Sequence, residues 1–190
     1  KYQEEIKTFA NFSTLFMGLV NENGGLELYD GMLRIMDSDG KPVTDDFAPE
    51  EFRTYIGEAV EPYSYLKSPY YKPLGYPGGI YRVGPLARLN IVDCCGTPLA
   101  DEAFADFRKL DHNSSFHYHF ARLVEILYCF EAIDQLLNEA DILSPHVRAH
   151  AFPNSDEGIG VSEAPRGTLM HHYRIDRNGL MILSDLMIAT

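Results

Sequence analysis

The stretch SFHYHFARLVEILYCFEAIDQLLNEA, residues 115–140, carries apolar residues at steps of three and four. The residues at these steps are Phe116, Phe120, Leu123, Leu127, Phe130, Ile133 and Leu137. This spacing places them on one face of an α-helix, which at ~1.5 Å per residue would be roughly 40 Å long. Asn113 or Ser114 would cap the helix, and Pro145 bars its continuation. A helix of this length is typical of a helical bundle.

A second helix is predicted immediately before it. Thr97 and Pro98 are residue types that favour an N-cap and a first helical turn, and the helical pattern continues to about Leu110. We therefore expect a helical hairpin over residues 97–141. A shorter helix is expected over residues 49–60, where a proline and two acidic residues open the segment.

Two β-hairpins are predicted outside the helices. Within residues 25–43, Asp30-Gly31 separates two short apolar segments, 26–29 and 32–36. Within residues 158–190, Asn178-Gly179 separates two further strand-like segments, and a Pro-Arg-Gly loop leads into them. The predicted fold class is α+β, with long bundle-type helices and peripheral antiparallel hairpins. The apolar run from Phe9 to Val20 is compatible with a short helix or a strand.

The composition excludes several classes of protein. The chain has 190 residues, 45% of them hydrophobic, and a formal net charge of −12 without a basic stripe, which argues against nucleic-acid binding. No apolar run approaches the ~18 residues of a membrane helix, and the start lacks the order of a signal peptide. Cys94, Cys95 and Cys129 have no Cys-x-x-Cys spacing, which favours core thiols in a reducing, cytoplasmic setting.

The ends and the histidines lead to two further expectations. The chain begins without methionine and stops within an apolar run, so we expect residues 1–190 to be a single fragment of a larger subunit. Two histidine pairs, His117 with His119 and His171 with His172, are not spaced for a shared metal ion on one helix face or one strand face. His146 and His150 have the i, i+4 spacing of a helix face, but no helical pattern or Glu-x-x-His motif accompanies them.

The segment SEAPRGTLMH, residues 162–171, contains the strongest candidate for a functional side chain. Arg166 lies between a ring-locked proline and a permissive glycine, so the direction of its backbone is fixed. The alternative is an ordinary β-turn with an ion-paired arginine.

Two segments together resemble a known family. Residues 163–167, EAPRG, with Leu169 and His171, and residues 79–90, GIYRVGPLARLN, resemble the large subunit of nickel-iron hydrogenases. The continuation TLMHHY, residues 168–173, and GEAVEP, residues 57–62, resemble the soluble, bidirectional, NAD-coupled class. The resemblance covers essentially the whole chain. It implies reversible hydrogen oxidation and proton reduction, with electrons exchanged with NAD through NAD-linked diaphorase subunits and an iron-sulfur small subunit.

The resemblance also implies site residues. Arg166 would be catalytic, and Ala164 and Pro165 would line the pocket around the CN and CO ligands of the iron. Thr190 would offer a hydroxyl to a cyanide, and the backbone carbonyl of Leu186 would bind a magnesium ion. The family binds its nickel-iron centre through two Cys-x-x-Cys motifs, which this sequence lacks, so the fragment is expected to hold no cofactor and to be inactive alone.

Two other interpretations remain open. One is the hydrogenase-like subunit of respiratory complex I, which contributes to a quinone site, although EAPRG followed by His-His argues against it. The other is a non-catalytic interaction domain that uses the aromatic stretch from Pro62 to Tyr76. This stretch is too aromatic for a disordered linker, so we expect it to be ordered and to pack on the body or on a partner subunit. The second interpretation predicts that Arg166 is a structural ion pair.

Overall fold

All six residues of one strand, β1 (Leu15–Val20), are buried, and the other elements are arranged around it. The structure is a computed structural model that describes residues 2–110, 112–148 and 154–189. Its helices are α1 (Gln3–Thr8), α2 (Phe52–Tyr55), α3 (Pro85–Ile91), α4 (Pro98–Phe107) and α5 (Tyr118–Leu137). Short 3-10 turns cover Pro49–Glu51, Lys72–Leu74, Ser115–His117 and Ala140–Leu143. Among the residues described, no helix combines the length and the apolar content needed to cross a membrane.

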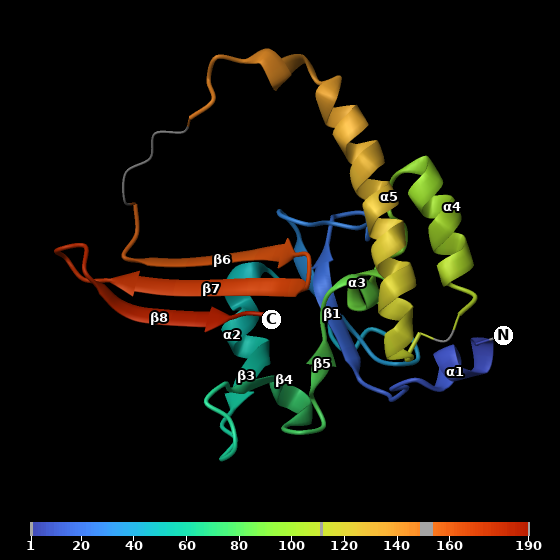
Figure 1. Cartoon of the computed structure of the whole chain (residues 1–190). Helices are drawn as coiled ribbons and strands as arrows, with labels where there is room; N and C mark the ends of the chain where they lie inside the picture. The colour runs from blue at the N-terminus through green and yellow to red at the C-terminus, as the bar shows by residue number, and fades with distance from the viewer. Residues whose placement is uncertain (1, 111, 149–153, 190) are drawn as a thin grey trace.

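The strands form three small sheets. They are β1, β2 (Met32–Met36), β3 (Ile56–Ala59), β4 (Ser68–Tyr71), β5 (Tyr81–Arg82), β6 (Glu157–Ala164), β7 (Gly167–Ile175) and β8 (Met181–Met187). β1 lies between β2, its antiparallel neighbour, and β5, its parallel neighbour. β3 pairs with β4, and β6, β7 and β8 form an antiparallel sheet in chain order. The mixture of helices and small sheets confirms the predicted α+β class (Figure 1).

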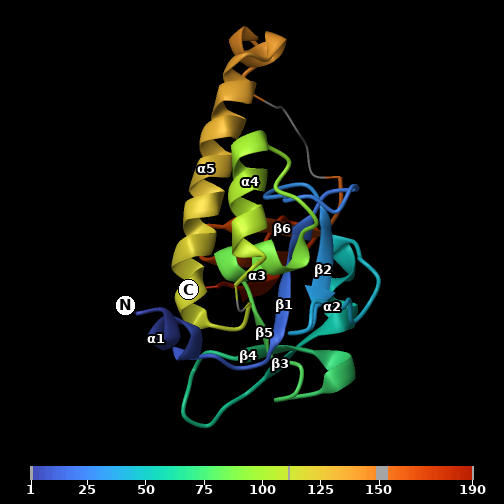
Figure 2. The same ribbon diagram turned by 90° about the vertical axis from the view of Figure 1, so that its right-hand side faces the viewer.

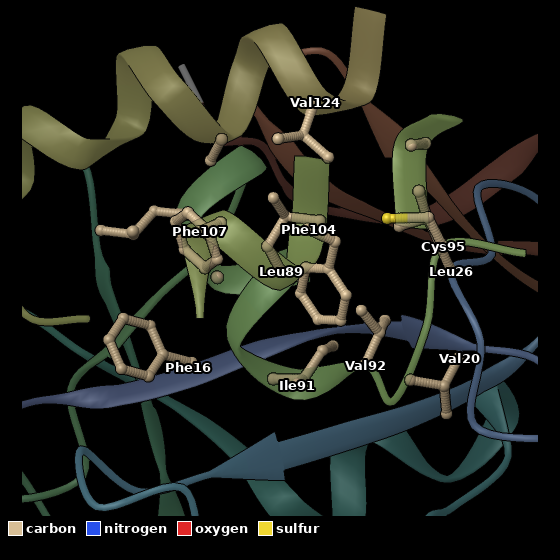
Figure 3. Close-up of a cluster of buried hydrophobic side chains, with 14 residues drawn as sticks. Phe16, Val20, Leu26, Leu89, Ile91, Val92, Cys95, Phe104, Phe107 and Val124 are labelled. Atoms are coloured by element: carbon tan, nitrogen blue, oxygen red, sulfur yellow. The ribbon is translucent and has the colours of Figure 1, made fainter. Parts of the chain in front are cut away.

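Two apolar clusters lie on opposite sides of β1. One contains Phe16 and Val20 of β1 together with buried residues of α3, α4 and α5, including Leu89, Phe104 and Val124 (Figure 3). The other contains Leu15, Met17 and Leu19 of β1 with side chains of β2, α2, β7 and β8. β1 alternates between the two clusters because successive side chains of a strand point to opposite faces.

α4 and α5 lie within the range predicted for a helical hairpin, and the two helices lie side by side in both views (Figures 1 and 2). The side chain of Thr97 does not cap α4. Instead, Glu131 of α5 accepts hydrogen bonds from the amides of Leu99 (3.0 Å) and Ala100 (2.9 Å) and from the Thr97 hydroxyl (2.6 Å). A carboxylate at a helix N-terminus satisfies free N–H groups and complements the dipole, so α5 completes the start of α4.

The predicted apolar face of α5 is wrong in part. Ala121 and Val124 are the residues of α5 that are fully buried, whereas Leu123 is 62% and Phe130 is 68% exposed. α5 is apolar around much of its circumference, and α3 and α4 cover only one side of it. The periodicity alone therefore could not identify the side that packs.

The predicted hairpin over residues 25–43 is also corrected. β2 pairs with β1 and not with residues 26–29, so Asp30-Gly31 does not join two paired strands. Leu26 instead forms an isolated bridge with Val20, and its amide donates to the carbonyl of Cys94. A strand that is buried on both faces, such as β1, needs partners at both edges, and this requirement outweighs the local turn signal.

The helix predicted over residues 49–60 ends at Tyr55, because the chain enters β3 at Ile56. The aromatic stretch from Pro62 to Tyr76, which was predicted to be ordered, contributes β4 to a sheet with β3. The run from Phe9 to Val20 contains the strand β1, which resolves the alternative of helix or strand.

Candidate functional site

Pro165 and Arg166 form the two-residue connection between β6 and β7, in which Ala164 pairs with Gly167. Where the sequence predicted a hairpin over residues 158–190, the structure has a three-stranded sheet. A turn at residues 176–180 joins β7 to β8, and β6 is the strand that the sequence did not indicate. Figure 1 shows the β6–β7 turn at the inner end of this sheet, near α3 and α5, and the β7–β8 turn at the outer end. The end of the sheet that carries the Pro165–Arg166 connection thus lies next to the body of the fold.

Two glycines allow the chain to pass closely around this turn. Gly84 has φ +87°, and a β-carbon at this position would lie 2.5 Å from the carbonyl oxygen of Arg166. Gly167 has φ +151°, and a β-carbon there would lie 2.3 Å from Val83 Cγ2 and 2.8 Å from Ala189 Cβ. Glycine has no β-carbon and tolerates positive φ, so only this residue type fits both positions without a shift. The two motifs that carry the family resemblance therefore meet at the turn.

Arg88 of α3 connects the two motifs chemically. Its side chain is 2% exposed. It donates from Nε to Glu125 Oε1 (2.5 Å), from Nη2 to Glu125 Oε2 (2.8 Å) and from Nη1 to Glu163 Oε2 (2.7 Å). Nη1 also donates to the carbonyl of Ala164 (3.0 Å), and Nη2 to that of Pro165 (3.5 Å). One guanidinium thus binds α5, the end of β6 and the backbone of the turn.

The carboxylate of Glu163 is fully enclosed, with a side-chain exposure of 0%. Its Oε1 accepts hydrogen bonds from the Leu19 amide (3.1 Å) and the Thr168 hydroxyl (2.8 Å), and its Oε2 accepts from Arg88. Burial raises the pKa of this carboxyl, and Arg88, Thr168 and the Leu19 amide oppose the rise. Because each partner is a donor, the ionised carboxylate is the form that fits the site.

The pKa of Arg88 shifts in the direction that matches this pairing. Burial acts to lower it, but the hydrogen bonds and charges of Glu125 and Glu163 outweigh burial and raise the pKa above its ordinary value. A buried guanidinium that meets two carboxylates stays protonated. We call Arg88, Glu125 and Glu163 the buried charge triad.

Arg166 itself is exposed, and its guanidinium makes no hydrogen bond or ion pair with any residue that the structure describes. The ion pair that the interaction-domain interpretation predicts is therefore not formed by the described part of the chain. Ala164 and Pro165 line a cavity of about 300 Å³ next to the triad, together with Glu125 and Cys129.

The other predicted site residues are placed less directly. Leu186 pairs with His171 between β8 and β7 and lines a different cavity, of about 470 Å³, beside Glu58 and Asp185. Thr190 lies outside the described residues. Its neighbour Ala189 comes close to Gly167, so the described end of the chain lies beside the turn.

The described cysteines do not take part in a cluster of metal-ligating side chains. Cys95 is buried, and desolvation together with the nearby charge of Asp101 raises its pKa to about 12, which keeps it a thiol. Desolvation also raises the pKa of Cys129, which is on the exposed side of α5. Within the described ranges, no three His, Cys, Asp or Glu side chains gather closely enough to hold a metal ion. His150, one of the histidines considered above, lies outside those ranges.

Sequence reasoning did not assign a role to the triad. One available signal was the position of Glu125, a charged residue within the apolar run from Leu123 to Leu127. Another was Arg88, which stands between the apolar residues Ala87 and Leu89. A charge at such positions is rarely buried unless it is paired.

The known proteins that this chain resembles are hydrogenases. Residues 7–182 match the family model for nickel-dependent hydrogenases. The chain is 44% identical to a vhu subunit of the F420-non-reducing hydrogenase from Methanocaldococcus jannaschii, covering 100% of this chain and 46% of that protein. It is 39% identical to NAD-reducing hydrogenase HoxS subunit beta of Cupriavidus necator, covering 100% of this chain and 40% of that protein.

Solved structures agree with these relatives. A crystal structure of NAD+-reducing [NiFe]-hydrogenase in the H2-reduced state superposes with a TM-score of 0.93 at 38% identity, covering 100% of this chain and 43% of that chain. The Ni-Fe-Se hydrogenase from D. vulgaris Hildenborough, at 24% identity and a TM-score of 0.67, shares the fold. The chain thus spans less than half of the length of these relatives. On this evidence the chain belongs to the nickel-dependent hydrogenase family.

Proposed function

We propose that this chain is a section of the catalytic large subunit of a nickel-iron hydrogenase, which interconverts molecular hydrogen with protons and electrons. The observation that carries the proposal is the Pro165–Arg166 turn. The buried charge triad holds this turn, which lies where the two family motifs meet. The guanidinium of Arg166 has no hydrogen-bond or ion-pair partner among the described residues. The hydrogenase motifs also favour this function over a quinone-site subunit of complex I.

In this function Arg166 is the catalytic residue. A guanidinium stays protonated at neutral pH, so electrostatic stabilisation of charge that develops as hydrogen is split is easier for it than proton abstraction. Ala164 and Pro165 would line the pocket around the CN and CO ligands, Thr190 would donate its hydroxyl there, and the carbonyl of Leu186 would bind magnesium. Because this sequence lacks the two Cys-x-x-Cys motifs of the family, the ligands of the nickel-iron centre would come from outside these 190 residues.

The electron acceptor and the partners belong to the same proposal. The TLMHHY segment and the similarity to an NAD-reducing enzyme support an NAD-coupled hydrogenase. It would work in the cytoplasm with NAD-linked diaphorase subunits and an iron-sulfur small subunit. The relatives also include F420-non-reducing enzymes, so hydrogen-dependent reduction of NAD by the assembled complex is the assay that distinguishes the acceptor.

The aromatic stretch favours a second, compatible role in contacts between subunits. Tyr63 is 81% exposed and Tyr65 is 95% exposed, although tyrosine usually buries much of its ring. Exposed aromatic side chains of this kind are enriched at protein interfaces. Replacing both by serine should weaken the association between subunits and leave the turn unaffected.

Arg166→Lys in the assembled enzyme tests the proposed function. Lysine keeps the charge but lacks the planar fork of donors, so we expect hydrogen turnover to fall about 100-fold or more. Nickel and iron content, measured by elemental mass spectrometry, should stay unchanged. Arg177→Lys is the matched control, because Arg177 is exposed at the outer turn of the same sheet. Unchanged turnover in Arg166→Lys would remove the catalytic role.

A further inference from the structure

We propose that Arg88 is a positioning residue that fixes the direction of the Pro165–Arg166 turn, with Glu163 and Glu125 as its counter-charges. This inference rests on the proposed function, because it assigns the reason why Arg166 points in one direction.

Both terminal nitrogens of the Arg88 guanidinium hold the residues that precede Arg166. Nη1 holds the Glu163 carboxylate and the Ala164 carbonyl, and Nη2 reaches the Pro165 carbonyl. These are the three residues that directly precede Arg166. Since the backbone of two of them is bound to one rigid guanidinium, rotation of the turn relative to α3 would break several hydrogen bonds together.

Glu125 anchors the other edge of the guanidinium. Its two carboxylate oxygens accept from Nε and Nη2, which is the bidentate arrangement that a planar fork allows. Glu125 belongs to α5, so the plane of the Arg88 side chain is set by the long helix. The orientation of α5 is thereby transmitted to the turn through a single side chain.

Energetics favour orientation as the purpose of the triad. A charge with an exposure of 2% gains little net stability from pairing, because the cost of removing it from water offsets the attraction. An apolar side chain would fill the same space without that cost, but it would leave the carbonyls of Ala164 and Pro165 without the donors that Arg88 supplies. Directional bonds to these carbonyls define the geometry of the turn more narrowly than apolar packing does.

Arg88→Lys in the assembled enzyme separates this role from a general structural one. Lysine retains one positive charge but cannot hold Glu125, Glu163 and the two carbonyls together. We expect kcat for hydrogen oxidation to fall about 10- to 100-fold, because a small displacement of a catalytic group has effects of this size. We also expect faster amide hydrogen exchange in a peptide that covers residues 163–169.

The kinetic part is a double-mutant cycle with Arg166→Lys. If Arg88 acts through Arg166, Arg88→Lys should cause no further loss of kcat once Arg166 is already lysine. Arg82→Lys is the matched control. Arg82 is also buried and also donates to carbonyls, but these belong to Phe12 and Asn113. Arg82→Lys should change kcat by the same factor whether residue 166 is arginine or lysine.

The outcomes are distinct. Faster exchange at residues 163–169 with non-additive kinetics supports the positioning role. Unchanged exchange, or additive kinetics when Arg166→Lys is itself impaired, overturns it. Faster exchange with a fully active Arg166→Lys variant would remove the catalytic role of Arg166 and still leave Arg88 as the residue that fixes the turn. If Arg88→Lys does not assemble, Thr168→Val is the second variant, because it removes one hydrogen bond to Glu163. It should also make amide exchange at residues 163–169 faster, by a smaller amount. An unchanged exchange rate in Thr168→Val would overturn the proposal.

Discussion

Gly84 lies directly against the carbonyl oxygen of Arg166, at a distance that leaves no room for a β-carbon. The contact joins the segment before α3 to the β6–β7 turn, so the shape of one motif depends on the other. Two residues that are 82 positions apart in the sequence (166 minus 84) are thereby placed in van der Waals contact.

Gly84→Ala should therefore destabilise the chain by more than backbone strain alone. Gly96 is the matched control: its φ of +91° is close to the +87° of Gly84, but a β-carbon at Gly96 would have no neighbour within 4 Å. We expect Gly96→Ala to lower the free energy of unfolding by about 1 kcal/mol. Gly84→Ala should lower it by about 1–3 kcal/mol more, because the turn has to move. Denaturant unfolding measures both, and equal losses would show that the turn yields without cost.

The cap that Glu131 provides for α4 predicts a dependence of stability on pH. Partial desolvation acts to raise the pKa of Glu131, but hydrogen bonds from Thr97, Leu99 and Ala100 outweigh it and lower the pKa. A carboxylate with a lowered folded-state pKa stabilises the fold fully above its unfolded pKa, about 4.3, and this contribution is lost as pH falls through the lower folded-state value.

Glu131→Gln should therefore reduce the free energy of unfolding at pH 7, and the difference from the unmodified chain should shrink below about pH 4. Unfolding curves at a series of pH values measure this difference. Glu102→Gln, on the exposed surface of α4, is a control that should have little effect at pH 7. A difference that grows toward acid pH would contradict the capping role.

The packed side of α5 can be tested with two neighbouring residues. Val124 is 1% exposed and Leu123 is 62% exposed. Val124→Ala should lower the free energy of unfolding by about 1–3 kcal/mol, because it leaves a cavity in the cluster shown in Figure 3. Leu123→Ala should change it by less than about 0.5 kcal/mol. The reverse order would mean that α5 packs through the apolar stripe predicted from periodicity.

The cysteines should differ in their reaction with iodoacetamide at pH 8. Cys95 is buried with a pKa raised to about 12, so its thiol should remain unmodified in the folded chain. Cys129 is exposed and should be alkylated first, even though its pKa is also raised. Mass spectrometry of peptides gives the order, and all three thiols should react in denaturant. Early modification of Cys95 would show that its cluster opens readily.

Local signals in the sequence were sufficient for the elements that depend on local chemistry. Pro98 and the helical spacing were sufficient to locate α4 and α5, although Thr97 does not cap α4 and α5 begins at Tyr118, after a 3-10 turn, without the side-chain cap predicted from Asn113 or Ser114. The turn at residues 176–180 is closed by Asp176, which accepts from the amides of Asn178 and Leu180. The resemblance located Arg166, and the structure explains its setting.

Long-range pairing could not be predicted in the same way. Nothing near Asp30-Gly31 indicates that β2 would pair with β1, because that choice depends on burial of β1 between two clusters. The cap from Glu131 and the contacts of Arg88 are also invisible locally, since each partner comes from a different element. The one sign of these contacts in the sequence was a charged residue within an apolar segment. The partner of each such residue could be identified only from the folded structure.

The buried charge triad also has a consequence for the order of folding. Glu125 is 37 residues and Glu163 is 75 residues from Arg88 along the chain. An α3 that packed early would enclose a lone positive charge until both carboxylates arrived, which is unfavourable. Such distant contacts form late and cooperatively. A misassembled or half-folded chain thus cannot hold Arg166 in its working direction, and completion of the fold and completion of the site become one event.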